Sequence, residues 1–79
     1  MTITELHDYI IAEWRDGDQK PRKGYLSPED AESLQKSDVV KVPIEIKTNS
    51  LYEGQPAFNF DGVNFYVDQL LAPGGIRFE

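Results

Sequence analysis

Apolar residues near the start of the chain recur with the spacing of an amphipathic helix. At roughly 100° per residue, five of them fall on one broad side of a helix over residues 3–16. They are Ile3, Leu6, Ile10, Ile11 and Trp14. Thr2 and Glu5 have the spacing of a capping box, and Gly17 is suited to end the helix. The pattern therefore predicts a helix over residues 3–16 that buries this side.

The next segment is polar and then turns helical again. Residues 17–26 contain two glycines and a proline, which argue against regular structure and predict an irregular connection. Ser27 is suited to cap a helix, and Pro28 is suited to its first position. We expect a short second helix that ends near residues 36–37.

From residue 40 the pattern changes from helical spacing to alternation. The apolar members of the alternation are Val40, Val42, Ile44 and Ile46. Residues that alternate in this way point to opposite faces of a strand, so the pattern predicts a strand over residues 40–47. Pro43 has no N–H group to donate, which favours an edge position or a bulge for this strand.

Asp61-Gly62 carries the strongest hairpin signal in the chain. A two-residue loop there places Phe60 opposite Val63 and Phe58 opposite Phe65 on one face of the hairpin. Asn59, Asn64 and Tyr66 then lie on the other face. Pro73-Gly74-Gly75 predicts a further turn, after which residues 76–78 can add a last short strand.

These elements predict an α+β fold in a single domain over residues 1–79. Two N-terminal helices pack on an antiparallel sheet of three to four strands, in the order ααβββ with a short C-terminal strand. The helices are expected to cover one face of the sheet. Its apolar residues are Val42, Ile44, Phe58, Phe60, Phe65 and Val67.

Length and composition narrow the class of protein. With 79 residues there is room for one hydrophobic core, and the absence of cysteine excludes a disulfide or a thiolate metal site. No apolar run approaches the roughly 20 residues of a membrane helix. Glu5 and Asp8 interrupt the first apolar stretch, so we expect no signal peptide and a cytoplasmic protein.

The inventory of reactive side chains argues against an enzyme. His7 is the only histidine, and a lone histidine beside aliphatic neighbours favours a boundary position over a catalytic or metal-binding one. Carboxylates at Glu29, Asp30 and Glu32 suit the first turn of a helix without any further role. No cofactor fingerprint is present. We therefore expect no catalytic residues, no cofactor and no metal.

The charge favours a basic protein partner. The formal net charge is −6, and such a surface repels the phosphates of nucleic acids and attracts cationic partners. The polar side of the first predicted helix combines carboxylates with a tyrosine, which is a common anchor at protein interfaces. These candidate partner-binding residues are Glu5, Asp8, Tyr9, Glu13 and Asp16. Secondary candidates in the basic connection are Lys20, Arg22 and Lys23.

The sequence thus favours a non-catalytic protein-binding module, as a monomer or small homo-oligomer without nucleic-acid or membrane binding. One alternative is a structural or accessory subunit that self-associates through the edges of its sheet. Another is a single-strand nucleic-acid binder that stacks bases on Phe58, Phe60 and Phe65. The cost of exposing three phenylalanines favours a core position for them.

In size, acidity, lack of cysteine and helix-then-sheet plan, the chain resembles small phage or mobile-element proteins that inhibit bacterial defence, such as anti-CRISPR and anti-restriction proteins. The resemblance extends over the whole chain as composition and plan, without a shared motif. It implies an inhibitor of a bacterial nucleic-acid-binding complex that presents carboxylates where phosphates would lie. No functional residue is carried over from it.

Overall fold

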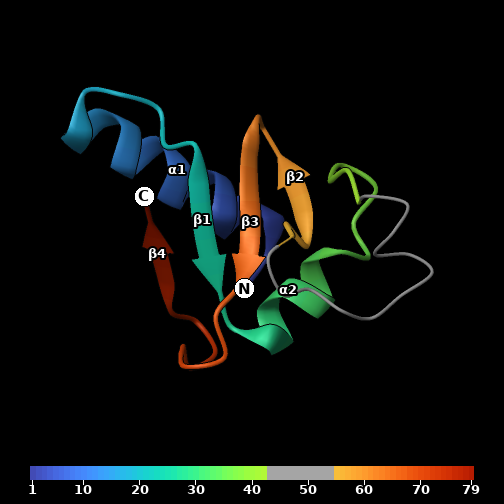
Figure 1. The fold of residues 1–79 in the computed structure, drawn as a ribbon. Coiled ribbons are helices and arrows are strands. Elements are labelled where there is room, and N and C mark those ends of the chain that lie inside the picture. Colours follow the sequence, from blue (N-terminus) through green and yellow to red (C-terminus); the bar gives the residue numbers. More distant parts are fainter. Residues whose placement is uncertain (43–54) are drawn as a thin grey trace.

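A computed structural model describes residues 1–42 and 55–79 of the chain. Two helices and four strands are present in this part (Figure 1). In chain order they are α1 (Ile3–Gly17), β1 (Lys23–Leu26), α2 (Pro28–Leu34), β2 (Phe58–Phe60), β3 (Val63–Val67) and β4 (Ile76–Phe78).

The four strands form one mixed sheet in the order β2-β3-β1-β4. β1 runs parallel to β3 and antiparallel to β4, while β2 and β3 form an antiparallel hairpin. The α+β class is confirmed, but the expected purely antiparallel sheet is wrong. The error arises because a strand lies between the two helices in sequence and enters the middle of the sheet.

That strand is β1, within the segment predicted to be irregular. Lys23 and Tyr25 point to the open face of the sheet, and Gly24 and Leu26 point to the core, so the period of a strand is present over four residues. In a sequence-based prediction, the two glycines and the proline of residues 17–26 weigh more than an alternation of only four residues. Pairing on both sides, with β3 and with β4, supplies the hydrogen bonds that the local sequence does not predict.

The first helix and its capping box are confirmed. The Thr2 hydroxyl accepts from the backbone N–H of Glu5 at 3.1 Å, and the Glu5 carboxylate accepts from the N–H of Thr2 at 2.9 Å. The helix includes Gly17, and the left-handed C-cap position is taken by Asp18 with φ 59°. Aspartate tolerates this conformation better than most residues with a side chain.

The second helix and the hairpin also follow their sequence signals. Ser27 caps α2 and Pro28 occupies its first turn, although the helix ends at Leu34, earlier than expected. In the hairpin, Asp61 and Gly62 both have positive φ, as a two-residue turn of this type requires. The register is the predicted one, with Phe58 opposite Phe65, Asn59 opposite Asn64 and Phe60 opposite Val63.

A single core joins both helices to the sheet. In Figure 1, α1 crosses behind the sheet and α2 lies below the ends of the strands. The fully buried part of the core comprises Leu6, Ile10, Leu26, Ala57, Phe58, Val63 and Phe65. Phe60, Val67 and Val42 are partly buried against it. The predicted apolar sheet face is therefore the packed face, as far as the described residues extend.

The predicted strand over residues 40–47 falls mostly outside the described residues. Within them, Val40 is buried and Lys41 forms an isolated antiparallel bridge with Asn59. Pro43, Ile44 and Ile46 lie in the part that is not described.

Candidate functional site

The exposed surface of α1 carries the main partner-binding candidates. Asp8, Tyr9 and Asp16 are all exposed, and 40% of the Tyr9 residue surface is accessible to solvent. Within residues 1–42 and 55–79, no cation pairs with Asp8 or Asp16. Glu5 is also exposed, but its carboxylate is occupied by the capping box. All three carboxylates contribute negative charge to this surface, and those of Asp8 and Asp16 pair with no cation among the described residues.

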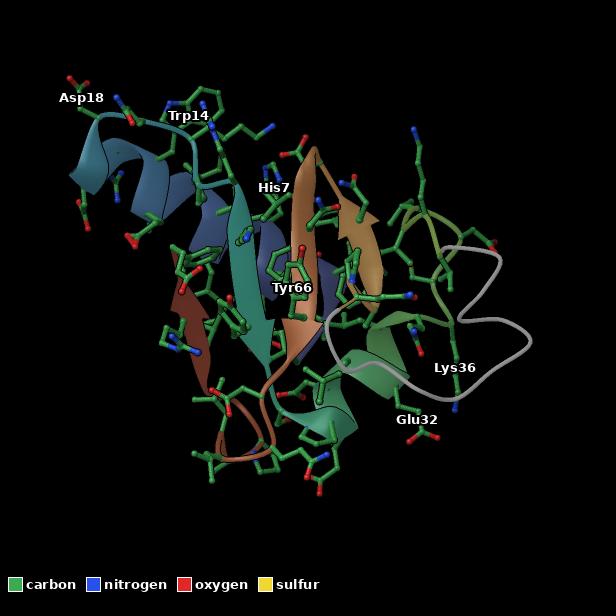
Figure 2. The ribbon with its side chains drawn as sticks, viewed as in Figure 1. His7, Trp14, Asp18, Glu32, Lys36 and Tyr66 are labelled. Atoms are coloured by element: carbon green, nitrogen blue, oxygen red, sulfur yellow. The ribbon has the colours of Figure 1, made fainter. Side chains whose placement is uncertain are left out.

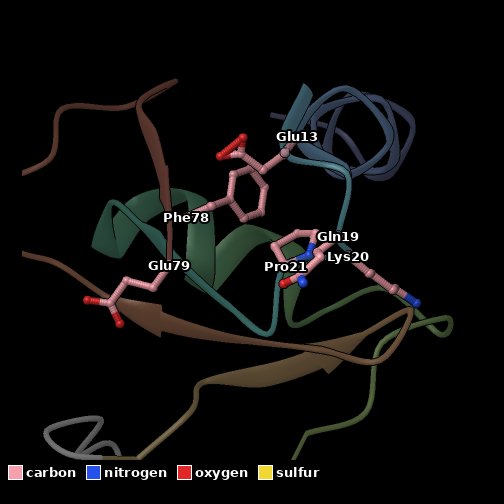
Figure 3. Close-up of a pocket in the computed structure, with 7 residues that line it drawn as sticks. Glu13, Gln19, Lys20, Pro21, Phe78 and Glu79 are labelled. Carbon is pink, nitrogen blue, oxygen red and sulfur yellow. The ribbon is translucent and has the colours of Figure 1, made fainter. Parts of the chain in front are cut away.

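Glu13 does not belong to this outward surface. It is partly buried and lines a pocket of about 210 Å³ together with Phe78 of β4 and Pro21. Figure 3 shows its carboxylate beside the Phe78 ring. Conversely, Ile11 and Trp14 were predicted to be buried but are 41% and 42% exposed. The expected clean division of α1 into an apolar and an acidic side is thus wrong.

The cause is the rotation at which α1 docks. Leu6 and Ile10 are its fully buried residues, and the line through them is the centre of the packed side. At about 100° per residue, Glu13 lies about 40° from this line and Trp14 about 60° on its other side, whereas Ile11 lies about 120° away and is turned from the sheet. The helical periodicity identifies the apolar side of α1, but which of its residues are buried depends on how the helix packs against the sheet.

The basic connection does not form one patch. The Lys20 ammonium lies 3.8 Å from the Asp61 carboxylate in the hairpin turn and 5.4 Å from the centre of the Trp14 ring. Lys23 points to the open face of the sheet, where its ammonium lies 5.7 Å from the centre of the Tyr66 ring. Arg22 is exposed between them. The three candidates therefore diverge to different surfaces.

A ladder of aromatic and cationic side chains covers the sheet face that points away from α1. The rings of Tyr25 and Tyr66 stack with centroids 5.6 Å apart, and Figure 2 shows Tyr66 on this face of β3. The Arg77 guanidinium lies 4.2 Å from the centre of the Tyr25 ring. Its nitrogen also bonds the Asp68 carboxylate at 3.1 Å. The sequence pattern does not predict this ladder, because its strand signal over residues 23–26 is only four residues long.

Both tyrosine rings of the ladder have neighbours already. Each contacts the other and a cation, so neither offers two free faces on which a base could stack. On the packed face, Phe58 and Phe65 are fully buried, and their rings lie 5.2 Å apart. Base stacking on those two phenylalanines is therefore excluded.

The Tyr25 hydroxyl provides a direct test of the ladder in solution. It donates a hydrogen bond to the Glu79 carboxylate at 3.0 Å, and this bond, with a smaller contribution from burial, raises the pKa of Tyr25 above its ordinary value. We expect Glu79→Gln to lower the pKa of Tyr25, measured from phenolate absorbance on alkaline titration. Tyr25→Phe assigns the transition. A transition that Glu79→Gln leaves in place would contradict the bond.

His7 lies on the exposed surface of α1 rather than at the predicted boundary. Its side chain is about half exposed, and its Nδ1 atom lies 4.0 Å from the Asp61 carboxylate. Among the described residues, no group of three His, Asp or Glu side chains converges to hold a metal ion. In the same part of the chain, neither helix has the length and apolar character needed to cross a membrane.

The fold defines the chain as a small two-layer α+β protein with a mixed four-stranded sheet in its described part. No family model matches the sequence, and neither a curated protein nor a solved structure shows significant similarity to it. Function must therefore be inferred from the surfaces described above.

Proposed function

We propose that this chain is a non-catalytic protein-binding module whose α1 surface contacts a basic partner. The observation that carries the proposal is that Asp8, Tyr9 and Asp16 are all exposed on α1, with neither carboxylate neutralised within the described residues. Tyrosine is a common anchor at protein interfaces. Unpaired carboxylates attract a cationic surface and speed its encounter.

We further propose that the partner is a nucleic-acid-binding protein of a bacterial defence complex, which the chain inhibits. Such a partner carries lysines and arginines placed to meet phosphates. The carboxylates of α1 would occupy those side chains and exclude the nucleic acid. The net charge of −6 supports this choice, since it opposes binding of the chain itself to nucleic acid.

Charge reversal on α1 tests the proposal. The immobilised chain captures proteins from its native host at low salt, and we expect Asp8→Lys with Asp16→Lys to lower recovery of the partner by about tenfold or more. Recovery of the partner by the wild-type chain should fall as salt rises, because exposed charges are screened. Tyr9→Ala should also weaken capture, by about tenfold if Tyr9 is an anchor.

A matched control uses carboxylates on the other helix. Glu29 and Glu32 are exposed on α2, so their double replacement by lysine changes the net charge equally without touching α1. This variant should recover the partner as well as the wild-type chain does. The purified partner should also lose affinity for labelled DNA or RNA when the wild-type chain is added. Equal capture by the two double variants would contradict the role of α1, and unchanged affinity for nucleic acid would contradict inhibition.

A further inference from the structure

The sheet has one open edge in its described part. β4 pairs with β1 on one side and, within residues 1–42 and 55–79, with no strand on the other. The opposite edge, at β2, is bridged by Lys41. Its N–H donates to the Asn59 carbonyl at 2.8 Å, and the Asn59 N–H donates to the Lys41 carbonyl at 2.7 Å. Among the described edge strands, β4 is therefore the one without such a bridge.

The register determines which main-chain groups of β4 face outward. Glu79 donates its N–H to the Lys23 carbonyl at 3.0 Å, and Arg77 lies opposite Tyr25. In an antiparallel ladder, hydrogen-bonded residues recur at every second position, so Arg77 and Glu79 are turned toward β1. Ile76 and Phe78 consequently present their N–H and C=O groups to the open side.

A pocket lies beside the C-terminal end of this edge. It is formed by the last turns of α1, the connection over residues 19–21 and the end of β4, with Phe78 and Pro21 as its apolar part (Figure 3). Glu13 contributes a carboxylate above the Phe78 ring. Lys20 also lines the pocket, but its ammonium extends toward Asp61 and the Trp14 ring. No described residue pairs with Glu13.

We propose that β4 takes an extended, basic segment of the partner protein as an added strand, with one lysine or arginine seated in the Glu13 pocket. Main-chain bonds to Ile76 and Phe78 would hold the segment, as in other cases of strand addition. The aliphatic stem of the cation would lie on Phe78 and Pro21, and its charge would meet Glu13. The choice of a basic partner rests on the proposed function, but the surface is a different one.

A second copy of the chain fits this edge less well. In an antiparallel β4–β4 pair, the register centred on Arg77 places two Arg77 side chains opposite each other and is destabilising, whereas the register centred on Phe78 places Arg77 opposite Glu79. Each copy also carries a net charge of −6, so the copies repel one another. A basic segment avoids this repulsion and neutralises Glu13.

Peptide titration followed by NMR tests the proposal on the whole chain. The probe is a short blocked peptide of alternating valine, threonine and lysine, compared with the same peptide carrying glutamate for lysine and with one carrying a central proline. We expect saturable amide shifts centred on Ile76 and Phe78 with the lysine probe, and no saturable shifts with the other two. No saturable shift with the lysine probe at millimolar concentration would overturn the proposal.

Two neutral substitutions locate the charge that matters. Glu13→Gln should weaken binding of the lysine probe about fivefold, the upper range for one partly exposed ion pair. Glu29→Gln, which removes an exposed carboxylate from α2, should leave that affinity unchanged. Equal affinities of the two variants would overturn the pocket assignment. Concentration-dependent shifts at β4 without peptide, together with a dimer in sedimentation, would assign the edge to a second copy and overturn the proposed occupant.

The two proposals fail in different ways. Loss of probe binding in Glu13→Gln bears only on β4, because Glu13 lies away from the outward surface of α1. Loss of partner capture in the Asp8 and Asp16 reversal bears only on α1. A chain that captures its partner through α1 and does not bind the lysine probe would keep the proposed function and overturn the inference about β4.

Discussion

Replacing Gly24 with alanine is expected to destabilise the fold by about 2–3 kcal/mol, the upper range for forcing an extra methyl group into a packed core. A Cβ atom at this position would overlap the Phe65 ring at Cε1 and would lie 2.7 Å from its Cδ1 atom and 3.3 Å from Cε1 of Phe78. The Phe65 ring cannot swing aside easily. It is fully buried, with Phe58 stacked on it at 5.2 Å and Phe78 edge-on at 6.2 Å.

Urea unfolding followed by circular dichroism measures this loss. Gly17→Ala is the matched control, because a Cβ atom there meets nothing within 4 Å. Since Gly17 is the last residue of α1, alanine should raise stability by up to about 1 kcal/mol. In a double-mutant cycle, Phe65→Leu should reduce the cost of Gly24→Ala, because the smaller side chain frees space. Equal effects of the two glycine substitutions would contradict the packing of β1 under Phe65.

Removal of the Asp30 side chain is expected to cost about 2–4 kcal/mol, because it leaves one buried and two partly buried donors without an acceptor. Asp30 is almost fully buried at the start of α2. Its carboxylate accepts from the Gly74 N–H at 2.7 Å, from the Ser27 hydroxyl at 3.1 Å and from the Met1 amino group at 3.3 Å. One side chain thus joins α2, the turn before β4 and Met1, two residues before α1.

Asp30→Ala is compared with Glu29→Ala, its exposed neighbour in the same helical turn. Glu29 contributes through the helix dipole, so its replacement should cost at most about 1 kcal/mol. Urea unfolding at neutral pH measures both variants. A cost for Asp30→Ala no larger than that for Glu29→Ala would contradict the buried network.

The same carboxylate predicts sensitivity to acid. Burial by itself acts to raise the pKa of Asp30, but the bonds from Gly74, the Met1 amino group and Ser27 outweigh it and hold the pKa below the ordinary value of 3.8. A lowered pKa in the folded state means that the carboxylate stabilises the fold above its unfolded pKa. This stabilisation is lost as the pH falls below about 4. The stability difference between the wild-type chain and Asp30→Asn should therefore shrink as the pH is lowered through that range.

Several elements of the fold were determined locally and could be predicted from the sequence. Thr2 and Glu5 start α1, Ser27 and Pro28 start α2, and Asp61-Gly62 sets the register of the hairpin. Each of these signals acts over a few residues, through a side chain that bonds a neighbouring main chain or adopts an unusual φ. Nothing distant is needed to explain them.

The candidate site was predictable only in part. Exposure of Asp8, Tyr9 and Asp16 agrees with the helical pattern, but the positions of Glu13, Ile11 and Trp14 do not. A helical pattern states which residues share a side. The angle at which that side meets the sheet depends on residues far away in sequence, and here it turns Glu13 toward Phe78.

The sequence by itself determined where the helices and the hairpin begin, that one core forms, and that the surface is acidic. Only the tertiary structure decided that residues 23–26 form an inner strand, parallel to β3. The reason is that glycine has a low intrinsic preference for strands, so Gly24 does not predict one. A glycine is nevertheless required there, because the Phe65 ring occupies the space that a side chain would need. The open edge at β4, the Glu13 pocket and the tyrosine ladder all depend on that inner strand or on its packing, so they became visible only with it.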